Sequence, residues 1–302
     1  MNNTTSSETT LVCANCGKKG TDVTNTCNKC KSVMYCNAAC KKKHRHKHKK
    51  ECARRVAELH DEKLFAQPPP LEDCPICFLR VPSLESGSVY MNCCGKRICR
   101  GCTHTVESRA AKKEDYICPF CRTQAANSYM EMISRYKKRV EQDDTIGMRD
   151  LGFMYRNGEN GLLQNRAKAL ELYRRAAELG DAGAYCFIGY TYKNGDGVDV
   201  DEKKAVHYFE LAAMGGNAQA RRNLGVKECR AGNYDRALKH LMIATRDGDS
   251  ESLKGIRTMY MSGHATKDDY AKVLRSYQEY LGEIKSDQRD EAAAFHEEYR
   301  YY

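Results

Sequence analysis

The chain from Ser128 onward has a helical pattern, with Ala, Leu and Tyr interspersed among Glu, Lys and Arg. The pattern recurs at an offset of 36 or 37 residues, from 169 to 205 and from 144 to 181. The clearest copies pair 144–158 with 181–195 and 169–180 with 205–216, a shorter third copy spans 217–248, and a degenerate fourth spans 249–281. A period of this length with helix–loop–helix character predicts stacked helical hairpins rather than one globular core.

Small residues recur at matching places in these copies. Gly152 and Gly189, together with alanines of the second helix, let paired helices approach closely, and Tyr155 and Tyr192 fill the space between layers. The pattern resembles the Sel-1-like repeats, relatives of the tetratricopeptide repeat. We therefore predict an all-α solenoid of helical-hairpin repeats at 128–281, with a capping helix at 282–302 that closes its open apolar end.

The N-terminal part of the chain lacks this pattern. Residues 1–66 are too polar to bury much apolar surface, so disulfides or metal ions have to hold the fold together. The expected divisions are a disordered tail at 1–10, a cysteine-rich domain at 11–54, a helix and proline-rich linker at 55–71, and a second cysteine-rich domain at 72–124. The linker helix runs through RRVAELHDEKLF and ends before the three prolines that begin at Pro68.

Cysteine usage decides between metal and disulfides. Of the 17 cysteines, 15 lie within the first 121 residues. The polar start MNNTTSSETT has no apolar stretch suited to secretion, and no run approaches the ~20 apolar residues that span a bilayer. We expect a cytoplasmic or nuclear chain with no membrane association. Thiols stay reduced in those compartments, so clustered CxxC pairs predict zinc.

The first cysteine-rich block offers seven Cys and one His, enough for two tetrahedral zinc sites. These ligands are Cys13, Cys16, Cys27, Cys30, Cys36, Cys40, His48 and Cys52. Their spacing resembles the MYND-type zinc finger, including Tyr35 just before the fifth ligand. The resemblance implies interleaved sites, one of Cys13, Cys16, Cys36 and Cys40 and the other of Cys27, Cys30, His48 and Cys52.

The same resemblance implies a protein-binding module for short proline-containing peptides. The family usually has a Gln after its sixth ligand and an aromatic residue three positions before its His. Lys41 and Arg45 stand at these positions. The metal sites therefore carry over better than the peptide groove.

The second block offers eight sulfurs in four pairs. They are Cys74 with Cys77, Cys93 with Cys94, Cys99 with Cys102, and Cys118 with Cys121. CPIC and CPFCR at the two ends, with a CxxC between them, resemble the RING finger over residues 74–122. The resemblance implies an α+β cross-brace, in which the first and third pairs bind one zinc and the second and fourth bind the other. The whole chain is thus expected to bind four zinc ions.

One ligand position of this second block departs from the family. Lys96 occupies the slot of a histidine, and an ammonium group has no lone pair for a metal. Cys93, next to Cys94, can complete an all-cysteine site, or His104 can swing in. The third alternative is a site with three protein ligands and water, or an empty one. We expect the four-thiolate site.

A RING finger has no catalytic nucleophile; it holds a ubiquitin-charged conjugating enzyme in a reactive pose. The residues that the resemblance assigns to this docking are Ile76 between the first two ligands, Pro119 in the last CxxC, and Arg122 after the final ligand. The chain is therefore expected to be a RING-type ubiquitin ligase without a catalytic residue of its own, with protein substrates or peptides bound by the repeats and the MYND-like finger.

Two other functions fit the same sequence. In the first, both zinc blocks and the solenoid only bind proteins, as a non-enzymatic adaptor. The second uses charge: residues 41–55 hold nine Lys or Arg and one Glu, so +8 of the net +10 lies in this run. The run can be a solvated helix face, a nuclear-import signal or a nonspecific phosphate contact. No aromatic residues interleave there for base stacking, which makes nucleic acid the less favoured partner.

Overall fold

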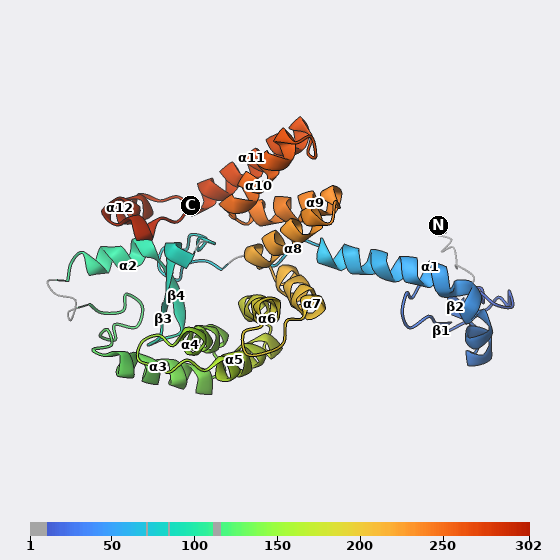
Figure 1. The fold of residues 1–302 in the computed structure, drawn as a ribbon, viewed down its shortest axis with the longest axis horizontal. Helices are drawn as coiled ribbons and strands as arrows, with labels where there is room; N and C mark the ends of the chain where they lie inside the picture. The colour runs from blue at the N-terminus through green and yellow to red at the C-terminus, as the bar shows by residue number, and fades with distance from the viewer. Residues whose placement is uncertain (1–10, 71, 84, 111–115) are drawn as a thin grey trace, which may run out of the picture. The chain divides into compact units, whose positions relative to one another are not determined.

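The computed structural model describes residues 11–70, 72–83, 85–110 and 116–302 (Figure 1). The chain divides into two compact units, Met1–Ala66 and Gln67–Tyr302. The tail predicted at 1–10 lies outside the described residues. Within the described ranges, no helix has the length and apolar character needed to cross a membrane.

The N-terminal unit consists of a small hairpin and one long helix. Strand β1 (Asn25–Thr26) pairs antiparallel with β2 (Met34–Tyr35), and helix α1 spans Ala38–Leu64. The Asn37 side chain caps α1 by accepting a hydrogen bond from the amide of Cys40. The buried core consists of three cysteines and two other side chains, namely Cys13, Cys27, Cys30, Val23 and Tyr35. So small a core agrees with a fold that depends on metal.

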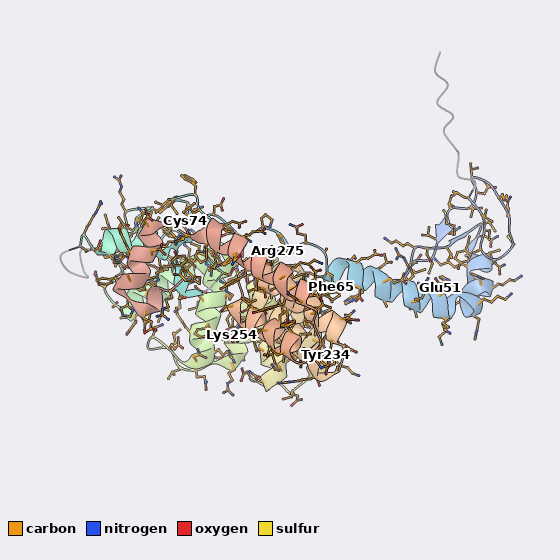
Figure 2. All side chains as sticks on the ribbon, turned by 90° about the horizontal axis from the view of Figure 1, so that it is seen from above. Glu51, Phe65, Cys74, Tyr234, Lys254 and Arg275 are labelled. Carbon is orange, nitrogen blue, oxygen red and sulfur yellow. The ribbon has the colours of Figure 1, made fainter. Side chains whose placement is uncertain are left out.

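Helix α1 is continuous over a region where the sequence suggested two pieces. The face carrying His48 and the helix through RRVAELHDEKLF belong to one 27-residue helix. No Gly or Pro interrupts the helix, which runs unbroken from the region of Glu51 to Phe65 (Figure 2). Arg54 and Arg55 form ion pairs with glutamates one and two turns further on. Most of the helix is exposed, so these pairs and its good helix formers sustain it rather than a buried face.

The second unit begins with the second cysteine-rich block. A short 3-10 turn η1 (Glu85–Gly87) leads into β3 (Ser88–Met91), which pairs antiparallel with β4 (Lys96–Cys99), and α2 (Arg100–Glu107) follows. Ile98 of β4 is fully buried in a core made mainly of cysteines. This hairpin and helix form an α+β arrangement between the cysteine pairs.

The remainder of this unit is a helical solenoid. Its helices are α3 (Tyr129–Glu141), α4 (Thr145–Asn157), α5 (Arg166–Glu178), α6 (Ala182–Asn194), α7 (Glu202–Met214), α8 (Ala218–Arg230), α9 (Tyr234–Arg246), α10 (Ser250–Met261), α11 (Lys267–Ile284) and α12 (Asp287–Phe295). The repeat is visible in its caps, because Asp144, Asp181 and Asn217 each accept a hydrogen bond from an amide in the first turn of α4, α6 and α8. Gly158 and Gly195 end α4 and α6 in the left-handed conformation.

Close approach within the hairpins explains the repeated glycines. A Cβ on Gly152 would lie 2.7 Å from the Tyr173 ring, and one on Gly189 would lie 2.7 Å from the Phe209 ring. Gly225 faces Leu241 in the same way, at 2.8 Å, so α8 and α9 form a third hairpin of the same kind. The glycine of α10, Gly255, shows no such close approach, because a Cβ there would meet Leu241 of α9 at 3.5 Å, which is ordinary contact.

Both ends of the solenoid contact the second cysteine-rich block. At one end, the Tyr90 hydroxyl of β3 donates to Asp144 at 2.8 Å, and its ring stacks on Tyr136 of α3. At the other end, the amide of Ser83 donates to the Tyr280 hydroxyl of α11 at 2.8 Å. Strands β3 and β4 thus lie between α3–α4 and α11–α12 (Figure 1).

The segment 282–302 contacts both the last helix of the solenoid and the cysteine-rich block. Helix α11 continues through its first residues to Ile284, and α12 then packs against α2 of the cysteine-rich block. The turn η3 (Glu297–Tyr299) follows α12, and Tyr299 lies under the guanidinium of Arg100. The C-terminal segment therefore covers the block on one side, while its Ala293 and Tyr301 pack with Tyr280 and Ile284 of α11 on the other.

Candidate metal centres

Four CxxC segments adopt the same local turn. In each, the amide of the residue after the second cysteine donates to the carbonyl oxygen of the first cysteine at 2.9 Å, and that residue has a positive φ. The four residues are Gly17, Lys31, Phe78 and Arg122, with φ between 55° and 73°. Three are not glycine, and the left-handed conformation costs such residues about 1–2 kcal/mol each. The turn points both sulfurs to one side, where a shared ion can compensate for this strain.

The first cysteine group joins a turn to the start of a helix. Cys13 and Cys16 come from the turn that precedes β1, and Cys36 and Cys40 flank the capped first turn of α1. The Sγ atoms of Cys16 and Cys36 lie 3.7 Å apart, and those of Cys36 and Cys40 lie 3.6 Å apart.

The second group uses the same helix about two to three turns further on. Cys27 and Cys30 form the turn, and His48 and Cys52 are four residues apart on α1. The Sγ atoms of Cys27 and Cys52 lie 3.7 Å apart, and Nε2 of the buried His48 lies 3.1 Å from Sγ of Cys30. The His48 ring stacks on the ring of His44, and His44 is hydrogen-bonded to the Tyr35 hydroxyl. This packing fixes the orientation of the His48 ring.

The third and fourth groups interleave along the chain. Cys74 and Cys77 meet Cys99 and Cys102, while Cys93 and Cys94 meet Cys118 and Cys121. The first and third pairs thus form one group and the second and fourth form the other. Sulfur–sulfur distances in these groups are 3.9, 3.7, 3.8 and 3.4 Å.

Lys96 and His104 take other places. The Lys96 ammonium lies 5.7 Å from the centre of the Phe120 ring, a cation–π contact. The His104 ring packs against Phe295 and Tyr299 of the C-terminal segment, away from the sulfurs. The structure therefore brings Cys93 together with Cys94, and not His104, beside the last CxxC pair.

The spacing of these sulfurs fits zinc. Four thiolates bound tetrahedrally at about 2.3 Å place their sulfurs about 3.8 Å apart. The observed sulfur–sulfur distances cluster around this value and greatly exceed the ~2.05 Å of a disulfide bond. In each of the four groups the ligand atoms all lie within 4.8 Å of one another. All four groups are thus compatible with a zinc ion.

The thiols within a group differ in pKa: the hydrogen bond with Cys40 raises the pKa of Cys36 to about 12, and burial raises the pKa of Cys52 to about 11. Burial alone would raise the pKa of the Cys13 thiol, but backbone amides that point at its sulfur lower the pKa to about 6. The pKa of Cys27 is likewise lowered to about 6, against burial, by the amides of its own turn and by His48. In the second block, hydrogen bonds from Cys102 and Cys99 hold the pKa of Cys74 far below its usual range. A lowered pKa favours the thiolate, which is the metal-binding form.

Comparison with known families matches two parts of this architecture. A family model described as the MYND finger matches residues 13–52, and the Sel1 repeat model matches residues 145–181 and 182–217. The chain carries a MYND finger followed by Sel1 repeats. The first range holds both cysteine groups of the N-terminal unit, and the Sel1 matches cover α4–α5 and α6–α7.

Several curated proteins are similar to parts of the chain. The ERAD-associated E3 ubiquitin-protein ligase component HRD3B of Arabidopsis thaliana is 31% identical over 103 residues, which is 34% of this chain and 16% of that protein. The E3 ubiquitin-protein ligase GW2 of Oryza sativa subsp. indica is 37% identical over 79 residues, and DA2 of Arabidopsis thaliana is 38% identical over 73 residues. The chain thus spans 16–17% of the length of these relatives.

Among solved structures, a Sel1 repeat protein from Oxalobacter formigenes matches with a TM-score of 0.44 and 30% identity. The match covers 51% of this chain and 64% of that chain.

The three predicted docking residues lie on turns of the second block. Ile76 is half-buried against the cysteine core, Pro119 is half-buried, and the Arg122 side chain is exposed. Two aromatic residues of these turns are also exposed, Phe78 at 77% and Phe120 at 46%. Exposed apolar rings on a small module are suited to contact with a protein partner.

Lys41 and Arg45, the two residues that depart from the usual MYND pattern, both lie on helix α1. Lys41 donates to the Thr26 carbonyl and to the Asn28 side chain, both at 2.7 Å, and so ties α1 to the β1 region. Arg45 is exposed on α1, as are most cations of the basic run. These exposed cations are the feature on which the nucleic-acid alternative depends.

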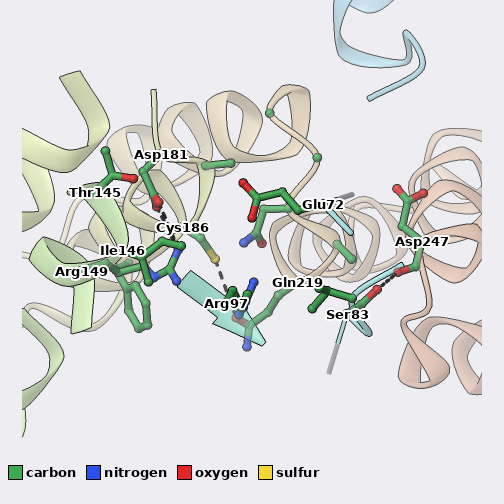
Figure 3. A pocket seen from close by; sticks show the side chains of 18 of the residues that line it. Glu72, Ser83, Arg97, Thr145, Ile146, Arg149, Asp181, Cys186, Gln219 and Asp247 are labelled. Carbon is green, nitrogen blue, oxygen red and sulfur yellow. Dashed lines mark hydrogen bonds and ion pairs between the residues drawn. The ribbon is translucent and has the colours of Figure 1, made fainter. Parts of the chain in front are cut away.

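A cleft of about 1040 Å³ lies inside the second unit (Figure 3). One side is formed by α4, α6 and α8 of the solenoid, and the other by Pro69, Pro70, Glu72, Val81, Pro82, Ser83, Ser86 and Arg97. Its walls carry paired charges, including Arg149 with Asp181, and aromatic rings at Phe153 and Phe187. No short sequence motif predicts this cleft, because its two walls come from segments that are distant in sequence.

Proposed function

We propose that the protein is a RING-type ubiquitin ligase whose Sel1 repeats bind the substrate. The observation that carries this proposal is the interleaved pairing of eight sulfurs between Cys74 and Cys121. This pairing is the cross-brace that the RING resemblance implies. Three relatives with partial similarity are named E3 ubiquitin-protein ligases or components of one, which adds support.

The role of zinc in this proposal is structural. We expect four ions per chain, two in the MYND finger and two in the RING-like block, each held by one of the four ligand groups. A site with four protein ligands leaves no open position for a water or substrate. The ions would fix the turns that carry Ile76, Pro119 and Arg122, and the chemistry would belong to the bound conjugating enzyme.

The reaction is transfer of ubiquitin from a thioester to an amine. The lysine nitrogen attacks the thioester carbonyl, an amide bond forms, the carbon–sulfur bond breaks, and the cysteine of the conjugating enzyme leaves as a thiolate while the amine loses a proton. The block would accelerate this step by orientation alone. The exposed guanidinium of Arg122 can donate several hydrogen bonds at once, which suits a bridge between two proteins.

We place substrate binding in the cleft between the Sel1 repeats and the RING-like block. Its volume is at the upper end for small-molecule pockets, and its lining mixes aromatic rings with Arg–Asp pairs of both signs. An extended polypeptide segment fits such a lining better than a strongly charged ligand. Because the block forms one wall, a bound segment would lie close to the ligase module.

The first experiment measures discharge of ubiquitin-charged conjugating enzymes onto free lysine. A panel of conjugating enzymes is tested with the zinc-loaded wild type, Ile76→Ala and Arg122→Ala, and zinc content is measured for each. We expect the wild type to accelerate discharge with at least one enzyme, and both variants to lose most of that acceleration at unchanged zinc. Arg257→Ala, an exposed arginine on α10, is the matched control and should behave as wild type.

A cleft variant separates the two parts of the proposal. Phe153→Glu places a charge in the cleft and should leave discharge onto free lysine unchanged while reducing modification of bound partners. Leu163→Glu, in an exposed loop, is its control. A zinc-loaded protein that accelerates no conjugating enzyme in a broad panel would favour the non-enzymatic adaptor instead.

A further inference from the structure

Arg289 of α12 is almost completely buried against the first turn of the RING-like block, with 1% of its surface exposed. Its Nη1 atom donates to the carbonyl oxygens of Arg80 at 2.9 Å and Ile284 at 2.6 Å. Its Nη2 atom donates to the carbonyl of Leu79 at 3.4 Å and faces Sγ of Cys77 at 3.8 Å. The guanidinium therefore binds the chain immediately after the Cys74–Cys77 turn from a position 212 residues away from Cys77.

The backbone of α12 is held close to the block by a glycine. A Cβ on Gly101 of α2 would lie 2.9 Å from the Arg289 backbone nitrogen and 3.0 Å from the carbonyl carbon of Gln288. Any larger residue would push α12 away. Beyond α12, the Ser86 hydroxyl donates to the carbonyl of Arg300 at 2.6 Å, so the segment is fastened on both sides of Arg289.

A buried arginine needs a negative partner, because removal of its charge from water is costly. The groups around its donors are carbonyl oxygens and the thiol of Cys77, with Cys74, Cys99 and Cys102 in the same sulfur group. Four thiolates around a zinc ion leave a net charge of about −2. A guanidinium with five donors is suited both to balance that charge and to hold the carbonyls that set the turn.

We infer that Arg289 is a positioning residue for the metal site of Cys74, Cys77, Cys99 and Cys102. It supplies the buried countercharge of the site and fixes the turn that carries Ile76. The C-terminal segment thereby completes a site whose ligands all lie far upstream. This inference rests on the proposed zinc binding of that group and is independent of ligase activity.

The test uses the full chain with cadmium-113 in place of zinc, so that each site gives its own NMR resonance. We expect four resonances in the wild type, and Cys77→Ser identifies the one that belongs to this site. Arg289→Gln should shift or broaden that resonance alone. This site should bind its ion about 10–100-fold more weakly, the usual loss for a residue that orients metal ligands, and should therefore release it faster to a competing chelator. Arg289→Lys keeps the charge without the planar fork and should lie between wild type and Arg289→Gln.

A second buried arginine supplies the matched control. Arg221 of α8 is also 1% exposed, but it lies in the helical solenoid. Arg221→Gln should lower solenoid stability and leave all four resonances and their exchange rates unchanged.

Three results would overturn the inference. Unchanged resonances and release rates in Arg289→Gln would mean that Arg289 only fills space. Equal disturbance of all four sites in both Arg289→Gln and Arg289→Lys, with loss of helical circular dichroism, would assign it a general role in folding. A wild type without the resonance of this site would remove the site itself, whereas a wild type with four resonances and no discharge activity would refute the ligase proposal and leave the role of Arg289 intact.

Discussion

At the scale of single residues, the fourth sulfur group depends on two adjacent cysteines. Neighbouring residues of a strand point to opposite faces, but Cys93 and Cys94 lie in the turn between β3 and β4, where this alternation does not apply. Cys94 approaches Cys118 and Cys93 approaches Cys121. Cys93 thereby takes the ligand position that a histidine in place of Lys96 would fill.

This arrangement predicts the zinc content of three variants. The wild type should hold four zinc ions, and Cys93→Ser and Cys94→Ser should each hold three, because a site reduced to three thiolates binds zinc far more weakly. His104→Ala should keep four, since its ring packs on Phe295. Native mass spectrometry measures the number directly. Four ions in Cys93→Ser with three in His104→Ala would instead assign the position to the histidine.

Sequence reasoning found the residues of all four groups, because CxxC spacing is local and chemically specific. It left the fourth ligand open, because the choice between Cys93 and His104 depends on where α12 lies. It also passed over Lys31 and Phe78, whose left-handed conformations give no signal in a residue type other than Gly. Arg289 was missed for a related reason: a lone arginine in a polar segment resembles any surface arginine.

At the scale of elements, the glycines of the repeat set the distance between paired helices. Their predicted role in α4 and α6 agrees with the contacts of Gly152 and Gly189 with aromatic rings of the second helix. The extension to α8–α9 uses Gly225 and Leu241, a smaller pair that explains why the third copy is weaker in sequence. Helix α1 was harder to predict as one element because its buried residues, His48 and Leu64, do not form a periodic stripe.

The glycines predict opposite effects for two similar substitutions. Gly189→Ala should lower the free energy of unfolding by about 1–3 kcal/mol, because the new methyl group meets the Phe209 ring at 2.7 Å. Gly255→Ala in α10 should raise it by about 0.5–1 kcal/mol, because there the methyl group has room, 3.5 Å from Leu241, and alanine favours the helix. Urea denaturation of the zinc-loaded protein, followed by circular dichroism, measures both. Equal effects of the two substitutions would contradict the proposed packing role.

At the scale of the whole molecule, the second unit is closed by contacts between segments that are distant in sequence. The cysteine-rich block bonds to α3–α4 through Tyr90 and to α11 through Ser83, and α12 packs on α2. Repeat patterns predict contacts between neighbouring repeats only, so they could not predict that 282–302 packs on the cysteine-rich block. The same limit applies to the cleft, whose walls come from segments that are distant in sequence.

Removal of zinc should therefore loosen the second unit at its ends and spare its middle. With a chelator present, hydrogen exchange should accelerate in 72–124 and in α12, which packs on the block, while α5–α8 stay protected by their neighbours. Exchange measured by mass spectrometry, with zinc-saturated chelator as control, distinguishes these regions. Full protection of α12 after zinc loss would show that the solenoid alone holds this helix.

The contact between α12 and α2 also has a consequence for the timing of biosynthesis. A chain grows from its N-terminus at about 5–20 residues per second, so α12 leaves the ribosome roughly 10–40 s after the RING-like block. During this interval the surface of α2 around Gly101 has no helix to cover it, and the carbonyls of Leu79 and Arg80 lack the guanidinium that binds them. A nascent or prematurely terminated chain would carry the zinc ligands without the finished module. The RING-like block can therefore be completed by α12 only after all the intervening repeats have been synthesised.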